Sequence, residues 1–287
     1  MKNKQKIPKE DVYEASKNPR TNTLYGQIDK TVTIIGLGGG GEIALHLARS
    51  GVRRLNLIDF DTLEVGNLVR HACGSKYIGQ NKAEAVRDLL VEHNPVCKGS
   101  ILAYNWDIFK HREEFQSIVS TSDAVIIATD TDSSRLFIND VCVETNTPAV
   151  FVTMFPKGVG GQIFSYLPWA ACYGCFAHHE GRQGFIQKYV DTLEKIDCAS
   201  DRDVRSMPGL GIDQSFLAAI AARKTLDILL LDQEHLLPSL GNENRIVWST
   251  SGIPRVISKP LTSASEDVPK HEECYSCGNS QKIQTNL

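Results

Sequence analysis

The sequence lacks a long apolar run, and this argues against several classes of protein. No stretch approaches the roughly 18 consecutive apolar residues that a membrane span requires. The first twenty residues, MKNKQKIPKEDVYEASKNPR, are polar and contain no apolar core of a secretory signal peptide. We therefore expect a cytoplasmic protein without a membrane partner.

An excess of charge of one sign is also missing. The chain has 31 Lys and Arg residues against 34 Asp and Glu residues, so its net charge of −3 gives no argument for a nucleic-acid partner. Internal repeats are absent, and no linker rich in Pro, Gly or Ser divides the 287 residues. We expect one domain with an arm at 1–28, a nucleotide-binding half at 29–170, and a second part at 171–287.

Apolar β-branched runs alternate with helical patterns through the first half. We expect helices at 41–51, 81–95 and 132–146, and strands at 31–38 (including a turn), 53–61, 100–104, 122–130 and 148–154. The run at 122–130 is continuously apolar, which is typical of a strand buried on both faces. This order predicts an α/β fold with a Rossmann-like, doubly wound, mostly parallel sheet.

The second half has a different pattern and predicts an antiparallel C-terminal extension. Residues 160–168 are compatible with an antiparallel strand, and 176–206 with a long polar loop that contains a short helix. A strong helical pattern covers 213–231. Residues 244–251 and 254–261 resemble a closing hairpin.

The stretch GLGGGG at 36–41 fits the pattern G-x-G-x-x-G through Gly36, Gly38 and Gly41, directly after an apolar strand. A glycine turn that opens a helix is an anion site, because backbone N–H groups and the helix dipole both favour phosphate. Asp59 ends the next strand and is placed to bond ribose hydroxyls. NAD and ATP both satisfy this chemistry, so the loop does not distinguish them.

The residues after the loop favour a triphosphate. Asn67, Arg70 and Lys82 follow Asp59, and two fixed cations suit ATP better than the pyrophosphate of NAD. Taken singly, Arg70 is equally compatible with a surface ion pair and Lys82 with a solvated helix. Asp130 stands at the carboxyl end of a buried strand, where a carboxylate can hold Mg²⁺; the alternative is a helix N-cap, which Asp132 or Ser133 could also supply.

The sequence resembles the ThiF/MoeB/HesA family, the adenylating enzymes related to ubiquitin-activating enzymes. The matching stretches are GLGGGGEIALHLARSGV, LIDFDTLEVGNLVR, IGQNKAEAVRDLLVEHNP and ATDTDSSR, in family order. The resemblance implies ATP-dependent adenylation of the C-terminal glycine of a ubiquitin-like or sulfur-carrier protein, and it implies a homodimer. A terminal carboxylate has a pKa of about 3.5, so this reaction needs no general base.

By this resemblance Asp59 holds the ribose, Asn67, Arg70 and Lys82 contact the phosphates, and Asp130 carries Mg²⁺. Arg70, Lys82 and Asp130 are then the residues closest to the chemistry. The expected nucleotide contacts are Gly36, Gly38, Gly39, Gly41, Asp59, Asp61, Asn67, Arg70, Lys82 and Asp130.

Two C-x-x-C pairs, Cys172/Cys175 and Cys274/Cys277, are among the eight cysteines. Four thiolates in two such pairs predict a tetrahedral Zn²⁺ site, and four protein ligands leave no open position for catalysis. A redox pair is the competing interpretation. Cys198 lies where some family members carry an acceptor cysteine, but an incidental loop cysteine is an equally good interpretation.

Four positions depart from the family pattern. No clear copy of the N-terminal arginine motif that reaches the partner's ATP is present, and Arg20 is the nearest candidate. Gly40 stands where a larger residue is usual, and His71 where glutamine is common. Glu42 should repel a triphosphate unless it points away.

Four functions remain open at this stage. Besides activation of a carrier protein, the chain could adenylate a peptide C-terminus or the carboxylate of a modified tRNA, although the charge argues against tRNA. It could also be an NAD oxidoreductase, against which Asn67, Arg70, Lys82 and Asp130 argue, or a non-catalytic binding module with a decayed site.

Overall fold

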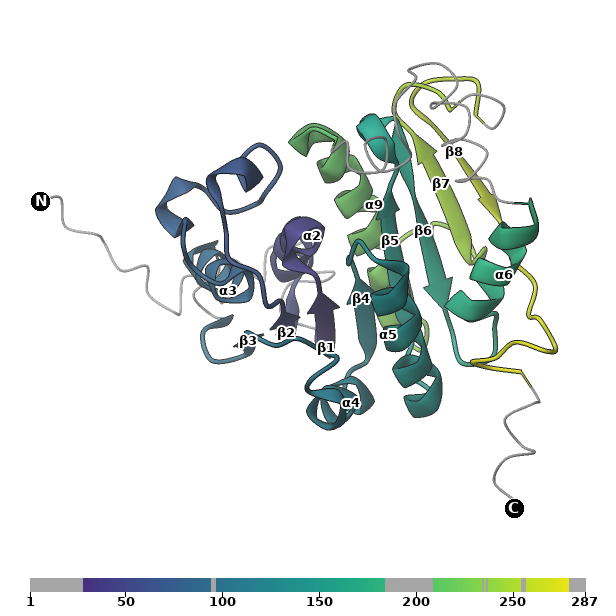
Figure 1. Ribbon diagram of the computed structural model, residues 1–287, viewed down its shortest axis with the longest axis horizontal. Coiled ribbons are helices and arrows are strands. Elements are labelled where there is room, and N and C mark those ends of the chain that lie inside the picture. The colour runs from purple at the N-terminus through teal and green to yellow at the C-terminus, as the bar shows by residue number, and fades with distance from the viewer. Residues whose placement is uncertain are drawn as a thin grey trace, which may run out of the picture.

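The computed structural model describes residues 28–93, 97–183, 209–233, 235, 237–253 and 257–278. In this part of the chain one sheet of eight strands has the order β3-β2-β1-β4-β5-β6-β7-β8 (Figure 1). The strands are β1 (Ile28–Ile35), β2 (Val52–Ile58), β3 (Ile101–Tyr104), β4 (Ala124–Ile127), β5 (Ala149–Met154), β6 (Gly160–Tyr166), β7 (Arg245–Ser249) and β8 (Thr262–Glu266).

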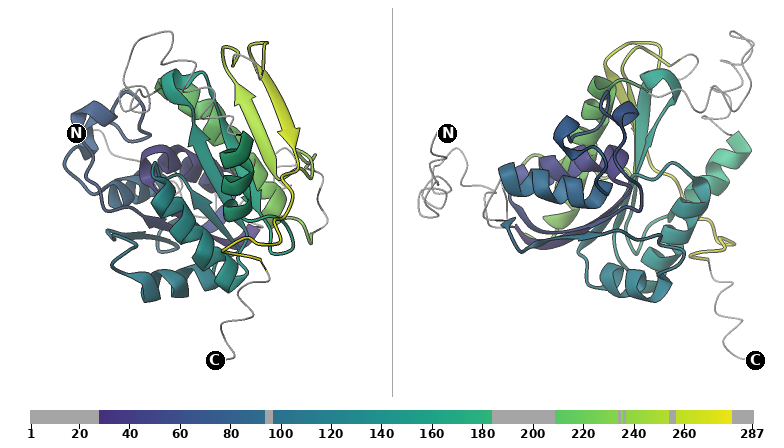
Figure 2. Two further views of the ribbon diagram at one scale, coloured as in Figure 1. Left: turned by 45° about the vertical axis from the view of Figure 1, so that its right-hand side comes forward. Right: turned by 60° about the vertical axis from the view of Figure 1, so that its left-hand side comes forward.

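The helices that connect these strands follow the expected alternation. They are α2 (Leu37–Arg49), α3 (Lys82–His93), α4 (Arg112–Ser120), α5 (Asp132–Thr145), α6 (Tyr173–Gln183) and α9 (Gly211–Leu229), with short 3-10 helices η1 (Val65–Asn67), η2 (Ser75–Tyr77) and η4 (Pro156–Gly158). Helices α2, α3 and α9 pack on one face of the sheet, and α4, α5 and α6 on the other (Figure 2).

The predicted mixed sheet is confirmed. Strands β3, β2, β1, β4 and β5 are parallel, whereas β6, β7 and β8 are added in antiparallel pairs. All four residues of β4 are buried, as its continuous apolar run predicts. Because β1 lies between β2 and β4 and is parallel to both, the carboxyl ends of these three strands lie side by side at one edge of the sheet.

Helix α2 begins earlier than the sequence pattern predicts. It starts at Leu37 rather than at residue 41, so that Gly38, Gly39 and Gly40 are helical and only Gly36 makes the turn. The prediction was wrong because glycine disfavours a helix interior by about 1 kcal/mol per residue relative to alanine. Packing of α2 against α3 and α9 compensates for this weak propensity.

The predicted closing hairpin is half right. Strand β7 lies within 244–251, but its partner is β8 at 262–266, not 254–261. The sequence TSASE of β8 is largely exposed and has no apolar alternation to reveal it. Ile257 of the expected strand instead pairs with Ile253, and both residues pack against Phe155 and Val247.

The remaining expectations for the second half are met in part. The antiparallel strand β6 falls within 160–168, and α9 matches the predicted late helix, although it begins two residues earlier. Helix α6 begins at Tyr173, inside the first C-x-x-C pair, and most of the region expected to be a loop lies outside the described residues. None of the described helices has both the length and the apolar character needed to cross a bilayer.

Candidate functional site

The turn after β1 is built by Gly36. Its φ of 84° lies in the left-handed region, and a Cβ there would come within 2.8 Å of the Ala128 carbonyl after β4, so only glycine fits. The Gly36 N–H donates to the Ile58 carbonyl at 3.0 Å. This turn therefore brings the ends of β1, β2 and β4 together at the start of α2.

The glycines of α2 serve two different purposes. A Cβ on Gly38 would meet nothing within 4 Å, and one on Gly39 would only touch the Gln214 side chain at 4.0 Å. A Cβ on Gly40 would come within 2.9 Å of Ile34, and one on Gly41 within 3.1 Å of Val86. Gly38 and Gly39 thus leave the first turn of α2 accessible, whereas Gly40 and Gly41 allow close packing.

Asp59 links the end of β2 to the start of α2. Its Oδ2 accepts the Leu37 N–H at 2.6 Å and its Oδ1 accepts the Asp61 N–H at 2.8 Å. Burial raises the pKa of this carboxyl, while these two backbone hydrogen bonds and the nearby Lys82 oppose the shift. A carboxylate accepting two N–H groups is held in one orientation and keeps further lone pairs for a ligand.

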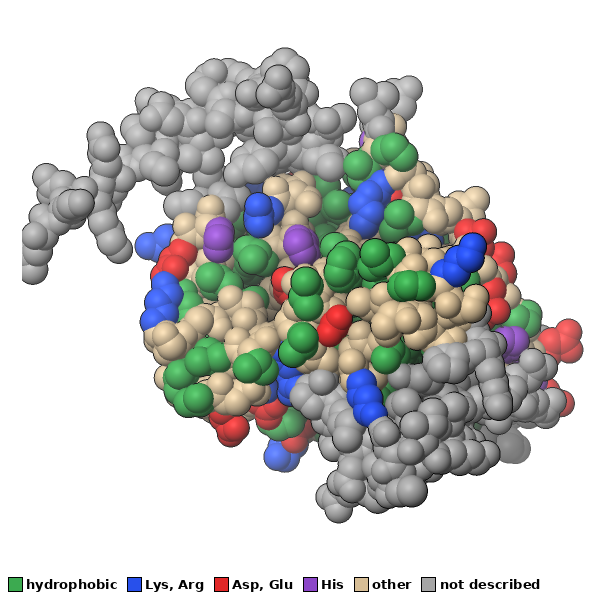
Figure 3. Space-filling view, turned by 90° about the horizontal axis from the view of Figure 1, so that it is seen from above, with side chains coloured by type: hydrophobic (Ala, Val, Ile, Leu, Met, Phe, Trp, Pro, Cys, Tyr) green, Lys and Arg blue, Asp and Glu red, His purple; other side chains and the backbone are tan. Residues whose placement is uncertain are grey.

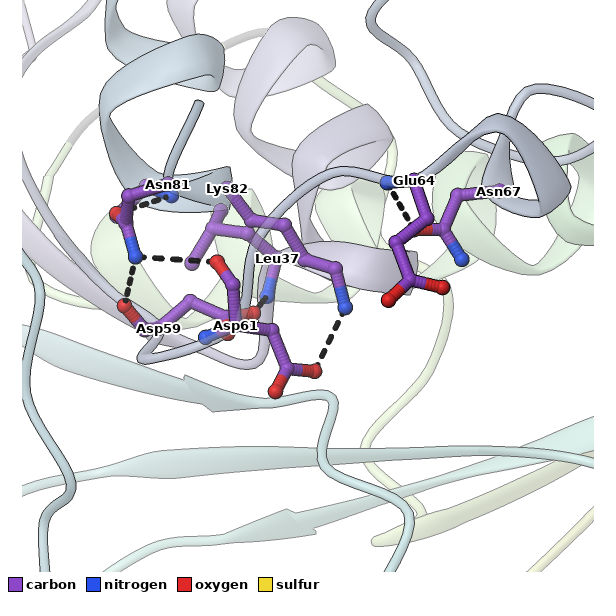
Figure 4. A network of polar contacts seen from close by, with 8 residues as sticks. Leu37, Asp59, Asp61, Glu64, Asn67, Asn81 and Lys82 are labelled. Carbon is purple, nitrogen blue, oxygen red and sulfur yellow. Dashed lines mark hydrogen bonds and ion pairs between the residues drawn. The ribbon is translucent and has the colours of Figure 1, made fainter. Parts of the chain in front are cut away.

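The side chain of Lys82, the first residue of α3, lies near Asp59 and Asp61. Its Nζ lies 2.7 Å from Oδ2 of Asp61, and only 12% of its side chain is exposed (Figure 4). The Lys82 N–H also donates to the Asp61 carbonyl at 2.9 Å. Asp61, predicted as a nucleotide contact, is thus the residue that holds the predicted phosphate lysine in this structure.

The loop between β2 and α3 carries Asn67 and Arg70. Asn67 ends η1, and its Oδ1 accepts the Glu64 N–H at 3.0 Å (Figure 4). The Arg70 N–H donates to the Asn67 carbonyl at 3.0 Å, and both side chains are half-buried. These local bonds fix the backbone of both residues.

Asp130 lies three residues beyond the end of β4 and is exposed. It does not cap α5, because Thr131 is the N-cap and its Oγ1 accepts the Ser134 N–H at 3.3 Å. The expectation that Asp132 or Ser133 would supply the cap was wrong. The carboxylate of Asp130 therefore does not cap α5, and it lies at the edge of the sheet where β1 and β4 are neighbours.

The carboxyl ends of the parallel strands form one face of the molecule. Seen from above, apolar side chains gather near its centre, with Lys and Arg side chains around them (Figure 3). Four exposed apolar residues belong to the loop around η1 and to the start of α9, and these two segments are joined by a 3.2 Å hydrogen bond from the Gly211 N–H to the Val69 carbonyl. The four are Val65, Val69, Leu210 and Ile212.

The four cysteines of the two C-x-x-C pairs come together. All four sulfur atoms lie within 4.8 Å of one another, with closest separations of 3.4 Å (Cys175–Cys277) and 3.6 Å (Cys172–Cys274). A tetrahedral Zn²⁺ with Zn–S bonds of about 2.3 Å requires sulfur separations of roughly 3.8 Å. The donor set and its spacing fit such an ion, and the separations exceed the length of a disulfide bond of about 2.05 Å.

The other described cysteines are unsuited to act as nucleophiles. Cys73, Cys97 and Cys142 are buried, and burial raises the pKa of each thiol, to about 12 for Cys73. Cys198, the predicted acceptor, and Arg20, the candidate trans arginine, lie outside the described residues.

Two residues of the candidate site, Asn81 and Gln214, were not predicted from the sequence. Asn81 donates to the carbonyls of Asp59 (2.9 Å) and Asp61 (3.1 Å), and its Oδ1 caps α3 by accepting the Ala83 N–H at 3.0 Å. An Asn before a helical pattern, with Glu84 three residues later, is the capping signal that predicts this role. Gln214 donates to the Gly38 carbonyl at 3.1 Å, a long-range contact without a local signal.

A model of the ThiF family matches residues 27–240, about three quarters of the chain. The chain belongs to the ThiF family. This confirms the resemblance, and the residues of the candidate site around the start of α2, from Gly36 to Gln214, fall inside the matched range.

Curated relatives are similar over the same region. The chain is 30% identical to ubiquitin-like modifier-activating enzyme 5 of Caenorhabditis briggsae, over 60% of this chain and 44% of that protein. It is 34% identical to the sulfur carrier protein ThiS adenylyltransferase of Escherichia coli, over 52% and 58%. It is also 34% identical to adenylyltransferase and sulfurtransferase MOCS3 of Dictyostelium discoideum, over 73% and 45%. The chain thus spans about a third to three fifths of the length of such relatives.

Solved structures share the fold. A crystal structure of E. coli MccB with ATP has a TM-score of 0.64 at 20% identity, covering 87% of this chain and 67% of MccB. The crystal structure of PaaA has a TM-score of 0.60, also at 20% identity, covering 84% of this chain and 73% of PaaA.

Proposed function

We propose that this protein adenylates the C-terminal glycine carboxylate of a small ubiquitin-like or sulfur-carrier protein, using ATP and Mg²⁺. Residues 1–287 would form one adenylation domain. The curated relatives whose names specify such carriers support the substrate class. The family match favours this proposal over an NAD oxidoreductase.

One observation carries the proposal: an accessible glycine turn, a fixed carboxylate and a lysine converge at the start of α2. Leu37 and Asp59 are joined at 2.6 Å, and Lys82 reaches Asp61 at 2.7 Å. Backbone N–H groups at a helix start favour phosphate, and the ammonium adds a positive charge beside them. A triphosphate is the ligand that uses all of these groups.

Each residue then has a defined task. Asp59 would accept the ribose hydroxyls, and Gly38 and Gly39 would let the nucleotide approach α2 closely. Gly36 would shape the turn around the nucleotide, and Gly41 would set the packing of α2 beneath it. Lys82, released from Asp61 by competition, would join Asn67 and Arg70 on the phosphates. Asp130 would hold Mg²⁺ through its exposed carboxylate.

The chemistry needs alignment and charge neutralisation. An oxygen of the carrier carboxylate attacks the α-phosphorus, forming a carboxyl–phosphate bond. The bond from the α-phosphorus to the bridging oxygen breaks, and pyrophosphate leaves with the electron pair. Arg70 and Lys82 stabilise the charge that develops on the transferred phosphoryl group and on pyrophosphate.

Further parts of the proposal concern assembly. The four clustered cysteines would hold a structural Zn²⁺ that joins the 268–278 tail to α6. The exposed apolar residues Val65, Val69, Leu210 and Ile212 would support docking of a protein partner, either the carrier or a second subunit of a homodimer. We place the enzyme in the cytoplasm, consistent with the free cysteines of the described residues.

Transfer of the acyl group to Cys198 is a separate step of the proposal. It is supported by the burial of Cys73, Cys97 and Cys142, which leaves no accessible thiol outside the metal cluster in the described part of the chain.

The deciding experiment is ATP–pyrophosphate exchange with purified candidate carriers that end in glycine. We expect exchange that depends on the carrier and disappears when its terminal glycine is removed. Exchange with small acids but with no carrier would contradict the proposal. Repeating the assay with Cys198→Ala tests the transfer: exchange should survive while a thioester adduct is lost.

A peptide C-terminus is the second candidate substrate. It is favoured by the likeness to the microcin C7 biosynthetic enzyme MccB, which was solved in complex with N-formylated MccA. The same exchange assay with short peptides separates the two, because a carrier-specific enzyme should not accept an isolated tail.

A further inference from the structure

His71 follows Arg70 directly and lies inside the nucleotide loop rather than on its surface. Only 9% of the residue is exposed. Its N–H donates to the Asn67 carbonyl at 2.9 Å, the same carbonyl that accepts the Arg70 N–H at 3.0 Å. The histidine therefore belongs to the turn that carries two of the three predicted phosphate contacts, Asn67 and Arg70.

The imidazole of His71 forms a second hydrogen bond, to the backbone that follows the turn. Its Nδ1 accepts the Cys73 N–H at 3.0 Å, so the neutral ring carries its proton on Nε2. His71 is thus hydrogen-bonded to Asn67 through its backbone N–H and to Cys73 through its imidazole. Arg70 lies inside the turn that the bond from the His71 N–H to the Asn67 carbonyl closes.

The ring also reaches α2 and α3. A Cβ placed on Gly41 would lie 3.9 Å from Cε1 of His71, and the backbone of Leu37 interacts with the imidazole. The charged group that faces the ring is Lys82 on α3, whereas Glu42 of α2 is bonded to Ser215 on α9. Burial and Lys82 both lower the pKa of His71, to about 4, which keeps the ring neutral and its Nδ1 free to accept.

We propose that His71 is a positioning residue for Arg70, because its neutral imidazole ties the 67–73 turn to the start of the glycine helix α2. This inference rests on the proposed function, since it concerns how Arg70 meets ATP. The ring needs no contact with the nucleotide. It fixes the backbone from which the Arg70 side chain extends, and it keeps that backbone in register with the helix start where phosphate binds.

Two substitutions separate the hydrogen bond from the ring. His71→Phe keeps a ring of similar size and removes the acceptor for Cys73. His71→Asn is smaller, but its Oδ1 can occupy the place of Nδ1 and accept the same N–H. We expect His71→Phe to lower kcat/KM for ATP in the exchange reaction about tenfold, the effect of one lost hydrogen bond, and His71→Asn to stay within about threefold of wild type. His93→Phe, an exposed position on α3, is the matched control and should change nothing.

A double-mutant cycle with Arg70→Ala distinguishes positioning from a general structural role. If His71 acts through Arg70, the His71→Phe/Arg70→Ala variant should be no slower than Arg70→Ala alone. Additive losses would overturn the inference, and so would a His71→Asn variant as impaired as His71→Phe, or a His71→Phe variant as fast as wild type.

The wild-type protein separates failure of this inference from failure of the proposed function. If wild type neither binds ATP nor exchanges pyrophosphate, the proposed function is wrong and the inference falls with it. If wild type is active and the cycle is additive, only the role of His71 is wrong. Nitrogen NMR of ¹⁵N-histidine-labelled protein gives a readout independent of activity: His71 should show an unprotonated Nδ1 at neutral pH, and a protonated Nδ1 would overturn the inference.

Discussion

Ser215 on α9 donates a hydrogen bond to Glu42 on α2, with 2.6 Å between Oγ and Oε1. The neighbouring Gln214 donates to the Gly38 carbonyl on the same helix. Because α2 begins at Leu37, Glu42 lies in its second turn, and its carboxylate is directed to α9. An acid near the proposed phosphate site is therefore held by a hydrogen-bond donor on another helix.

This pair predicts a charge effect on ATP binding. Ser215→Ala removes the donor and leaves the Glu42 carboxylate free to repel phosphate, so we expect KM for ATP to rise about tenfold. Glu42→Gln removes the charge, and the Ser215→Ala/Glu42→Gln double variant should return to near the wild-type KM. A double variant as weak as Ser215→Ala would show that the hydroxyl matters for packing rather than for the charge.

Alanine substitutions at two glycines of α2 should change the free energy of unfolding in opposite directions. Gly38→Ala adds a Cβ in open space and should raise the free energy of unfolding by about 0.5 kcal/mol through helix propensity, yet weaken ATP binding by blocking the approach of phosphate. Gly40→Ala brings a Cβ within 2.9 Å of Ile34 and should lower the free energy of unfolding by about 1–3 kcal/mol. Denaturant unfolding and ATP titration of both variants test this contrast; weaker stability in Gly38→Ala would contradict it.

Sequence patterns predicted those parts of the fold that local chemistry determines. The apolar run of β4, the helical pattern of α3 and the two C-x-x-C pairs each reveal their structure within a few residues. Strand β8 was missed because TSASE pairs only at the sheet edge and buries little. The start of α2 was missed because tertiary packing holds four glycines in a helix that their propensity disfavours.

The same limit applies to the site. Asp59 and Lys82 could be predicted because each stands at the end of an element beside a recognisable motif. The pairing of Lys82 with Asp61, and of Glu42 with Ser215, could not, because no spacing rule links residues 21 or 173 positions apart. Such contacts depend on how helices pack, which the sequence pattern does not specify.

We expect substitution of Lys82 to cause the largest loss of exchange activity. Lys82→Met keeps the aliphatic stem but removes the charge, and we expect exchange to fall by about 10²–10³ because the positive charge proposed to contact the reacting phosphates is lost. Lys76→Met is the matched control, since Lys76 pairs with Glu92 at an exposed position of the adjoining loop. Equal activity of both variants would remove Lys82 from the mechanism.

The cysteine cluster predicts one bound zinc per chain with a structural role. Cys274→Ser should lose the metal, measured by mass spectrometry of the digested protein, and should lower the melting temperature by about 5–10 °C. Tyr275→Ala, at an 84% exposed position between two ligands, should keep the metal. The cluster packs with α5 and α6 in the core on one face of the sheet, whereas α2 belongs to the core on the other face, so exchange by folded Cys274→Ser at low temperature should persist. Loss of exchange in the folded variant would imply a catalytic metal.

We expect His71 to make the free energy of unfolding depend on pH in the acid range. Burial and Lys82 lower its pKa from about 6.5 to about 4, so the unfolded chain binds more protons between these values. Stability from this residue is therefore fully present above about pH 6.5 and is lost as the pH falls toward 4, with a maximum on the order of 3 kcal/mol. Denaturant unfolding of wild type and His71→Asn at pH 7.5 and 4.5 measures it. Asparagine does not titrate, so the variant should lose less stability on acidification. Parallel losses in the two proteins would show that other groups, and not the imidazole beside Lys82, govern the acid limit.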